Sequence, residues 1–199
     1  MTRISRFSPR FRIWQASVLL LAASLGCATE LDPVASQIGF TLKTRWGQSL
    51  QGRFPEARGE VAELADGRHQ VRLQLSARSV EILGHPSYTR LTRGDGFFDA
   101  ERYPQVEFVS EAYAPQLLRS GGALPGVLTI RDVRHREVFI ISPATCARPA
   151  RDCDVVASGS IHRADFGMDR WTFALSVDGS LATCVREREG CEVGQPIHS

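Results

Sequence analysis

The sequence lacks the features that mark several common classes of protein. Its formal net charge is only +2, so it has no excess of basic residues of the kind that binds nucleic acid, and we expect no nucleic-acid partner. Lysine is nearly absent, since Lys43 is the only one among 24 basic residues, and we attribute this to coding bias. Neither Gly-x-Ser-x-Gly nor His-Glu-x-x-His occurs, so two familiar hydrolase signatures are missing.

A long apolar run is missing as well. The run at Ile13–Leu25 is too short for a membrane span, but its length and the arginines before it are typical of a signal peptide. We therefore expect residues 1–28 to be a signal peptide and the mature chain to be exported to the periplasm. Two processing routes stay open: cleavage after Ala28, which gives a soluble product, and lipidation of Cys27 in a lipobox-like Ser-Leu-Gly-Cys. Only that lipid would attach the protein to a membrane.

The cysteines agree with export. Besides Cys27 there are four, an even number that predicts disulfides in an oxidising compartment: Cys146, Cys153, Cys184 and Cys191. Six residues separate the members of each near pair, which is wider than zinc-knuckle spacing, so we expect no metal site. Pairing between near neighbours is the simplest of three connectivities, but the sequence leaves the choice open. A bridge across so short a loop adds about 2–3 kcal/mol in the chain-entropy picture.

From residue 36 onward, apolar and polar residues alternate with the period of two that indicates half-buried β-strands. In the first strand one face carries Ile38, Phe40, Leu42, Thr44 and Trp46. We expect strands at about 36–46, 49–63, 71–78, 105–112, 126–131, 137–142, 155–161 and 171–185. The second should bend where Gly52 and Pro55 interrupt it.

The stretch Leu91–Phe108 breaks the alternation. His85-Pro86 can open a short helix before it, and Arg93–Gly96 reads as a charged turn. The aromatic pair Phe97-Phe98 follows, and Tyr103-Pro104 then fixes an extended entry into the next strand. Two interpretations remain open, because the aromatic pair could close one end of a β-structure or simply pack beneath a loop.

Eight strands joined mostly by short turns favour an antiparallel barrel or sandwich. An eight-stranded barrel is wide enough to hold one small apolar ligand. Small inward residues such as Ala77, Ser110 and Gly159 leave volume inside, whereas large ones such as Phe40 and Phe108 fill it. The sequence therefore leaves open whether the barrel is hollow or solid.

Three separated stretches resemble the YceI-like family of lipocalin-type, polyisoprenoid-binding exported proteins. They contain Leu31-Asp32-Pro33, Ser36-x-Ile38-x-Phe40 and Gly52-Arg53-Phe54, then Leu91-x-Arg93-Gly94-x-x-Phe97-Phe98-Asp99, Tyr103-Pro104, Phe108 and Gly126-x-Leu128-Thr129-Ile130, and finally Gly159-x-Ile161-x-Arg163-x-Asp165-Phe166-Gly167-Met168. The order and spacing carry the resemblance rather than any single motif. An Arg-Asp-x-His-Leu run that is frequent in the family is absent, and the four later cysteines look like an addition.

The resemblance implies an all-β, eight-stranded, antiparallel up-and-down barrel, lipocalin-like, with a short helical insertion near residues 86–101. It also implies an apolar tunnel for an isoprenoid or other lipid-like ligand, with no other cofactor. The barrel domain should span 29–185, followed by a tail at 186–199, and a homodimer is compatible with the sequence. Our candidates for the tunnel wall are Phe40, Leu42, Trp46, Leu73, Leu75, Phe97, Phe98, Phe108, Ile130 and Ile161. Arg90 and Arg93 are candidates for contact with a ligand head group.

Two other functions stay open. The first is a solid barrel that serves as an interaction module for an envelope redox or stress-response partner. The second, weaker one is a hydrolytic enzyme that uses Asp95, Asp99 and His85, although we expect no enzyme and no catalytic residues. His162 stands beside Arg163 and Asp165, which suggests either a site or, as we favour, an ion pair that supports a turn.

Overall fold

The computed structural model describes residues 28–31, 36, 38–44, 47–168, 170 and 174–178, the last range as backbone only. The strands are β1 (Ala28–Glu30), β2 (Gly39–Thr44), β3 (Ser49–Arg53), β4 (Ala57–Glu63), β5 (His69–Ser76), β6 (Glu81–Ile82), β7 (Gln105–Ser110), β8 (Gly122–Ile130), β9 (Val133–Ile141), β10 (Ala157–Ser158) and β11 (Ala174–Asp178). The helices are α1 (Pro86–Arg93), α2 (Gln116–Ser120) and the 3-10 helix η1 (Arg163–Phe166). None of the helices in these ranges is long and apolar enough to cross a membrane.

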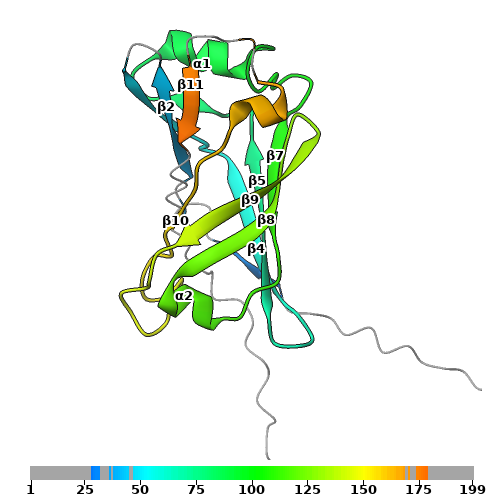
Figure 1. The fold of residues 1–199 in the computed structure, drawn as a ribbon, viewed down its shortest axis with the longest axis vertical. Helices are drawn as coiled ribbons and strands as arrows, with labels where there is room; N and C mark the ends of the chain where they lie inside the picture. Colours follow the sequence, from blue (N-terminus) through cyan, green and yellow to red (C-terminus); the bar gives the residue numbers. More distant parts are fainter. Residues whose placement is uncertain are drawn as a thin grey trace, which may run out of the picture.

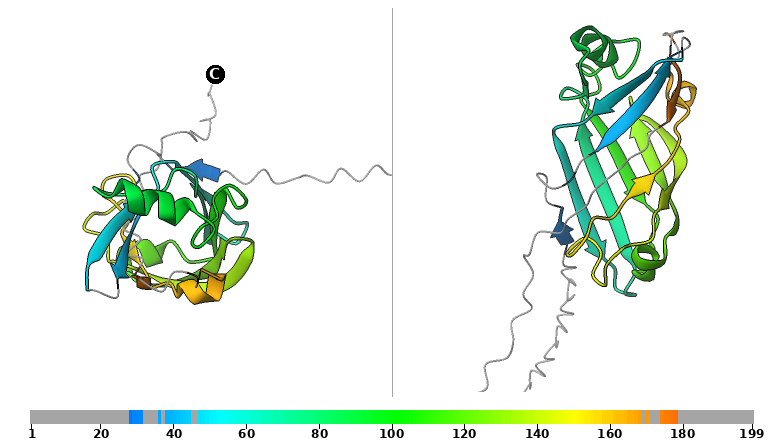
Figure 2. Two further views of the ribbon diagram at one scale, coloured as in Figure 1. Left: turned by 90° about the horizontal axis from the view of Figure 1, so that it is seen from above. Right: turned by 90° about the vertical axis from the view of Figure 1, so that its left-hand side faces the viewer.

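The strands form two antiparallel sheets around one interior. One has the order β1-β4-β5-β7-β8-β9-β10 and the other the order β11-β2-β3-β6. Seen along the strands, the sheets curl into a ring, and α1 lies across one end of it (Figures 1 and 2). The architecture is that of a lipocalin-like barrel, which confirms the fold class expected from the sequence.

The alternation along each strand decides which side chains face the interior. In β2 and just before it, Ile38, Phe40, Leu42 and Thr44 are buried, while Lys43 is exposed. The expected inward face of this strand is therefore confirmed over the described residues; Trp46 lies outside them. A one-residue shift of register would place this whole apolar set in water, so burial of one face fixes the register.

The second expected strand divides between the two sheets. It is interrupted between Arg53 and Ala57, so that β3 pairs with β2 and β6 whereas β4 pairs with β1 and β5. Pro55 in this gap has no backbone N–H to donate to a ladder, which explains why pairing stops there. The interruption that the sequence predicted is therefore the corner at which the chain passes from one sheet to the other.

Strands β8 and β9 form the longest hairpin, with nine residue pairs from Gly122↔Ile141 to Ile130↔Val133. Its two turn residues, Arg131 and Asp132, have φ of 53° and 61°, as a two-residue turn of type I′ requires. The Arg131 guanidinium donates a 2.6 Å hydrogen bond to the Gly167 carbonyl. The hairpin tip is thereby tied to the end of η1.

Helix α1 begins at Pro86 and ends before Gly94, close to the helix expected from His85-Pro86. Thr89 Oγ1 accepts from the backbone N–H of Ile82 at 2.9 Å, which holds α1 against β6. Helix α2 was not predicted, and the chain leaves it at Gly121, whose φ of 71° favours glycine. Strand β8 consequently starts at Gly122, four residues earlier than expected. The seventh expected strand is reduced to β10.

Candidate ligand cavity

A cavity lies inside the barrel and is lined entirely by apolar side chains. It contains about 50 Å³ of free space. The strands and loops contribute Phe40, Phe54, Leu73, Leu75, Phe97, Phe98, Val106, Phe108, Leu128, Ile130, Phe139, Ile161 and Met168. Such a wall offers no hydrogen-bonding partner, so any occupant would be held by burial of apolar surface.

Eight of the ten residues proposed for the tunnel wall line this cavity: Phe40, Leu73, Leu75, Phe97, Phe98, Phe108, Ile130 and Ile161. Leu42 is buried but lies away from the cavity, and Trp46 lies outside the described residues. A role in ligand binding stays a prediction for all ten residues. The sequence reading did not propose Phe54, Val106, Leu128, Phe139 and Met168. The alternation of inward and outward residues along β7, β8 and β9 indicates Val106, Leu128 and Phe139, whereas no local pattern indicates Met168.

Four phenylalanine rings form a cluster at the α1 end of the barrel. The ring centroids of Phe97 and Phe98 are 4.9 Å apart, Phe98 lies 5.6 Å from Phe54, and Phe54 lies 5.4 Å from Phe40. Phe40 and Phe98 are 6.3 Å apart. These spacings are those of favourable tilted and edge-to-face aromatic contacts. Phe97 and Phe98 are buried beneath the turn that follows α1 and also line the cavity, an arrangement that fits both interpretations of the pair.

Glycines in the barrel wall lie directly behind interior rings. A Cβ on Gly126 would fall 2.5 Å from Phe108 Cε2 and 2.6 Å from the Val109 carbonyl oxygen. A Cβ on Gly159 would fall 2.7 Å from Phe139 Cδ1. Phe108 and Phe139 contact each other at a centroid distance of 4.8 Å. The absence of side chains at these glycines therefore lets the rings lie against the wall and preserves the space in the middle.

The two arginines proposed for head-group contact differ in their surroundings. Arg90 is exposed on α1, and its guanidinium lies 3.5 Å from Ser87 Oγ. Arg93 is half-buried, and its Nε donates to the Val80 carbonyl at 2.9 Å and its Nη2 to the Ser79 carbonyl at 3.3 Å. Arg93 therefore fastens the end of α1 to the segment before β6. A head-group role remains a prediction for both, and Arg90 is the more accessible of the two.

The residues of the weaker enzyme alternative lie around α1. Asp95 is exposed and pairs with Arg170 at 3.3 Å. The His85 ring contacts the Tyr88 ring edge-to-face at a centroid distance of 5.7 Å. Asp99 has φ of 48°, and its backbone accepts from the N–H groups of the turn that follows. These contacts place the three residues in surface turns and caps.

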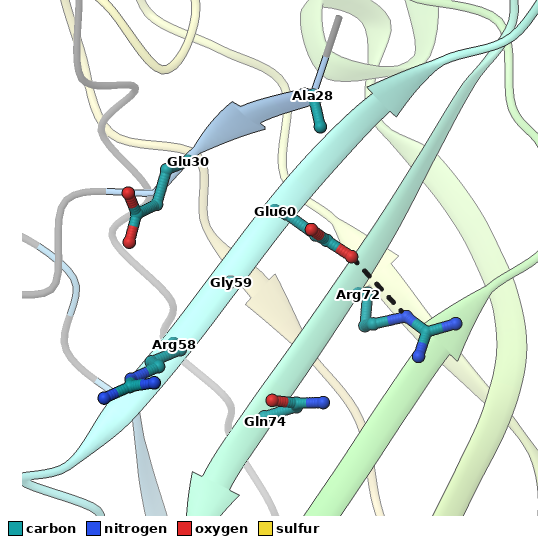
Figure 3. A pocket seen from close by; sticks show the side chains of 7 residues that line it. All are labelled: Ala28, Glu30, Arg58, Gly59, Glu60, Arg72 and Gln74. Carbon is teal, nitrogen blue, oxygen red and sulfur yellow. Dashed lines mark ion pairs between the residues drawn. The ribbon is translucent and has the colours of Figure 1, made fainter. Parts of the chain in front are cut away.

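A second hollow, of about 360 Å³, lies on the outer face of the large sheet. It is lined by Ala28, Glu30, Arg58, Gly59, Glu60, Arg72 and Gln74 (Figure 3). Arg72 pairs with Glu60 at 3.6 Å and with Glu107 at 3.1 Å; Arg72 and Glu60 are exposed, and Glu107 is half-buried. Because Leu73 and Leu75 alternate with Arg72 and Gln74 along β5, this charged hollow lies across the sheet from the apolar cavity.

A disulfide joins Cys146 to Cys153 in the loop between β9 and β10, with the Cα atoms 5.9 Å apart. Pairing between near neighbours is therefore confirmed for this pair. The bridge closes a surface loop in which Arg148 donates two 2.8 Å hydrogen bonds to Asp152. Those bonds lower the pKa of the Asp152 carboxyl below its ordinary value. Cys27, Cys184 and Cys191 lie outside the described residues, as do the expected signal segment up to residue 27 and the expected tail at 186–199.

The geometry defines the class of the protein as a lipocalin-like barrel with an apolar interior. Comparison with solved structures agrees. The crystal structure of Burkholderia cenocepacia BcnA is 20% identical, with a TM-score of 0.59, covering 74% of this chain and 93% of that one. A polyisoprenoid-binding domain from Saccharophagus degradans, implicated in plant cell wall breakdown, is 13% identical with a TM-score of 0.54, covering 72% and 82%. These likenesses establish the fold.

The sequence profile of the YceI-like domain matches residues 30–183, which is most of the chain. The protein therefore belongs to the YceI-like family, as the three stretches quoted above indicated. No curated protein sequence matches it significantly.

Proposed function

We propose that this protein is an exported binding protein that sequesters a long apolar ligand, of the isoprenoid or a similar lipid class, inside the barrel. The observation that carries the proposal is the interior cavity, because all of its lining side chains are apolar. The family supports it, and one fold relative is described as polyisoprenoid-binding. Binding would act by burial: each methylene removed from water contributes about 0.8 kcal/mol.

The ligand has to enlarge the cavity. Small-molecule sites in proteins usually have volumes of about 300–1,000 Å³, and this one has about 50 Å³. Movement of the rings of the aromatic cluster, Phe40, Phe54, Phe97 and Phe98, would join the cavity to the end of the barrel that α1 covers. We infer that the described conformation is closed and that ligand enters at this end.

Native mass spectrometry of the protein purified from the envelope fraction, followed by solvent extraction, tests the proposal. We expect a stoichiometric apolar molecule. A matched pair of variants locates it: Val106 lines the cavity, whereas Val138 is exposed on the outer face of β9. Val106→Phe should displace about two methylenes of ligand and weaken binding at least about tenfold. Val138→Phe should leave binding unchanged, and equal effects of both variants would contradict an interior site.

A second function is favoured by a different observation. Three exposed apolar side chains lie near one another at the β9–β10 edge: Val138, Ile140 and Val156, with 43%, 51% and 37% of their surface exposed. With so little free volume inside, a solid barrel that binds an envelope partner through this strip is the alternative. This alternative predicts that the purified protein contains no bound lipid and does not bind added isoprenoid alcohols. It also predicts that Ile140→Glu abolishes binding of the partner.

Catalysis is not part of the proposal. The family is one of binding domains, and Asp95 and His85 have the surface contacts given above. Turnover of an ester substrate that Asp95→Asn abolishes, with ligand binding intact, would contradict this.

A further inference from the structure

Three side chains with metal-binding groups meet near the end of the β8–β9 hairpin, on the same face of β9 as Phe139 but outside the set of residues that line the apolar cavity. His135 and Glu137 belong to β9, and Asp165 belongs to η1. One ligand atom from each lies within 4.8 Å of the others. His135 Nδ1 is 3.2 Å from Glu137 Oε1, and His135 Nε2 is 4.0 Å from Asp165 Oδ2. The group joins residues that are 28 positions apart in the sequence.

The fold holds β9 and η1 together by contacts that need no bound cation. His135 and Glu137 are two residues apart on one strand, so their side chains point to the same face. Helix η1 is held against β9 by the edge-to-face contact of His135 with Phe166 at 5.9 Å, and Arg131 donates to the Gly167 carbonyl. Phe166 is fully buried and anchors η1 in the core. The backbone positions of the three side chains are therefore set in advance.

We propose that His135, Glu137 and Asp165 bind a divalent transition-metal cation of the zinc class. An imidazole nitrogen and carboxylate oxygens bind Zn²⁺ at about 2.0–2.2 Å. Mg²⁺ and Ca²⁺ prefer shells of oxygen alone, so the imidazole favours a transition metal. Three protein ligands leave a fourth position for water or another small ligand.

The three ligand atoms need to move only slightly closer together to bind a cation. Tetrahedral ligands at these bond lengths lie about 3.4 Å from one another, compared with separations of up to 4.8 Å here. The side chains of His135 and Asp165 are 48% and 39% exposed, so they can change rotamer to close the gap. Glu137 is only 14% exposed, so its partly desolvated carboxylate provides a fixed first ligand. The cation would neutralise two carboxylates that otherwise share one imidazole.

Binding would cross-link β9 to a segment that also forms part of the cavity wall. Ile161 and Met168 flank η1 and line the cavity. A cation at the cluster should therefore make this side of the barrel more rigid whether or not an apolar ligand is bound. The inference does not rest on the proposed function, because the cluster is outside the cavity.

The test uses the full mature chain without a polyhistidine tag, stripped with EDTA and shown by thiol titration to carry no free cysteine. Calorimetric titration with ZnCl₂ should give one site per chain, and Zn²⁺ should raise the melting temperature. Replacing a residue that only hydrogen-bonds to a metal ligand typically weakens metal affinity about 10–100-fold. His135→Ala and Asp165→Asn each remove a proposed ligand, so each should weaken Zn²⁺ binding by more than about tenfold. Excess Mg²⁺ should not compete.

Matched controls are the exposed residues His85 and Asp154, which lie outside the cluster. His85→Ala and Asp154→Asn should bind Zn²⁺ like the parent chain. Absence of saturable binding would overturn the proposal. So would binding that persists in either His135→Ala or Asp165→Asn, or that the control variants weaken equally. Circular dichroism spectra identical to that of the parent would show that the variants are folded, so a loss of binding reports the site itself.

Discussion

A single methyl group placed on Gly52 should force an aromatic ring toward the cavity. Gly52 on β3 is the direct cross-strand partner of Phe40 on β2. An added Cβ would fall 2.5 and 2.6 Å from Phe40 Cε2 and Cε1, whereas carbon atoms pack at about 3.5–4.0 Å. The ring must therefore move by about 1 Å, and the free space into which it can move is the cavity of about 50 Å³.

The cost follows from two opposing effects. Overpacking a core typically costs about 1–3 kcal/mol. Replacing glycine by alanine lowers the conformational entropy of the unfolded chain, which stabilises the folded state by about 0.4–1 kcal/mol. We expect Gly52→Ala to lower the free energy of unfolding by about 1–2 kcal/mol. For a domain of this size that corresponds to a melting temperature about 2–8 °C lower, measured by circular dichroism.

The matched control is the double variant Gly52→Ala/Phe40→Leu. The smaller leucine at position 40 should relieve the overlap, so the double variant should be more stable than the sum of the two single effects predicts, by about 0.5–3 kcal/mol. Strict additivity, or a Gly52→Ala variant as stable as the parent, would refute the conclusion that the Phe40 ring lies against Gly52.

Three further predictions concern surface residues and helix α1. Cys146→Ser opens the bridge to Cys153 and should cost about 2–3 kcal/mol in chemical unfolding; an unchanged midpoint would contradict the chain-entropy account. Arg93→Met removes two hydrogen bonds to carbonyl groups, so it should cost about 1.5–3 kcal/mol and speed amide exchange in α1; unchanged exchange would show that the helix is held elsewhere. The pKa of Asp66 is lowered, chiefly by the Arg68 backbone N–H. Its stabilising effect is therefore present above pH 3.8 and lost as the pH falls through the folded pKa. Asp66→Asn should accordingly make the melting temperature fall less steeply below that pH, and an unchanged slope would contradict this.

The strands could be predicted from the sequence because burial of one face imposes a period of two. In β2 and β7 every second residue is buried, and in β2 the expected inward residues Phe40 and Leu42 are the observed ones. The same physics explains why most of the proposed cavity wall could be found. The prediction of the cavity wall depends on local alternation of apolar and polar residues, and this alternation is visible in a single sequence.

Contacts between distant segments leave no such local trace. Met168 reaches the cavity wall through η1, which interrupts the pattern of strands. His162, Arg163 and Asp165 were read as a local group, but Asp165 faces His135, and Arg163 Nη1 donates to the Met168 carbonyl at 2.8 Å. Only the path of the chain around the barrel brings η1 beside β9, so no spacing within either segment could predict their meeting.

The small cavity is compatible with a carrier if the ligand is long enough. The aromatic cluster of Phe40, Phe54, Phe97 and Phe98 contains four pairwise ring contacts. At about 0.5–1.5 kcal/mol each, breaking them all costs about 2–6 kcal/mol. At about 0.8 kcal/mol per methylene, a ligand gains nothing until about three to eight methylenes are buried.

Affinity should therefore show a threshold in chain length. Short alcohols should not bind, and beyond the threshold each added methylene should tighten binding about fourfold until the barrel is full. A series of linear alcohols in competition with a fluorescent apolar probe measures this. Phe97→Ala, which removes one ring from the cluster, should move the threshold to shorter chains. A solid barrel would bind no member of the series, and binding on the outer surface would increase with chain length without a threshold and without response to Phe97→Ala.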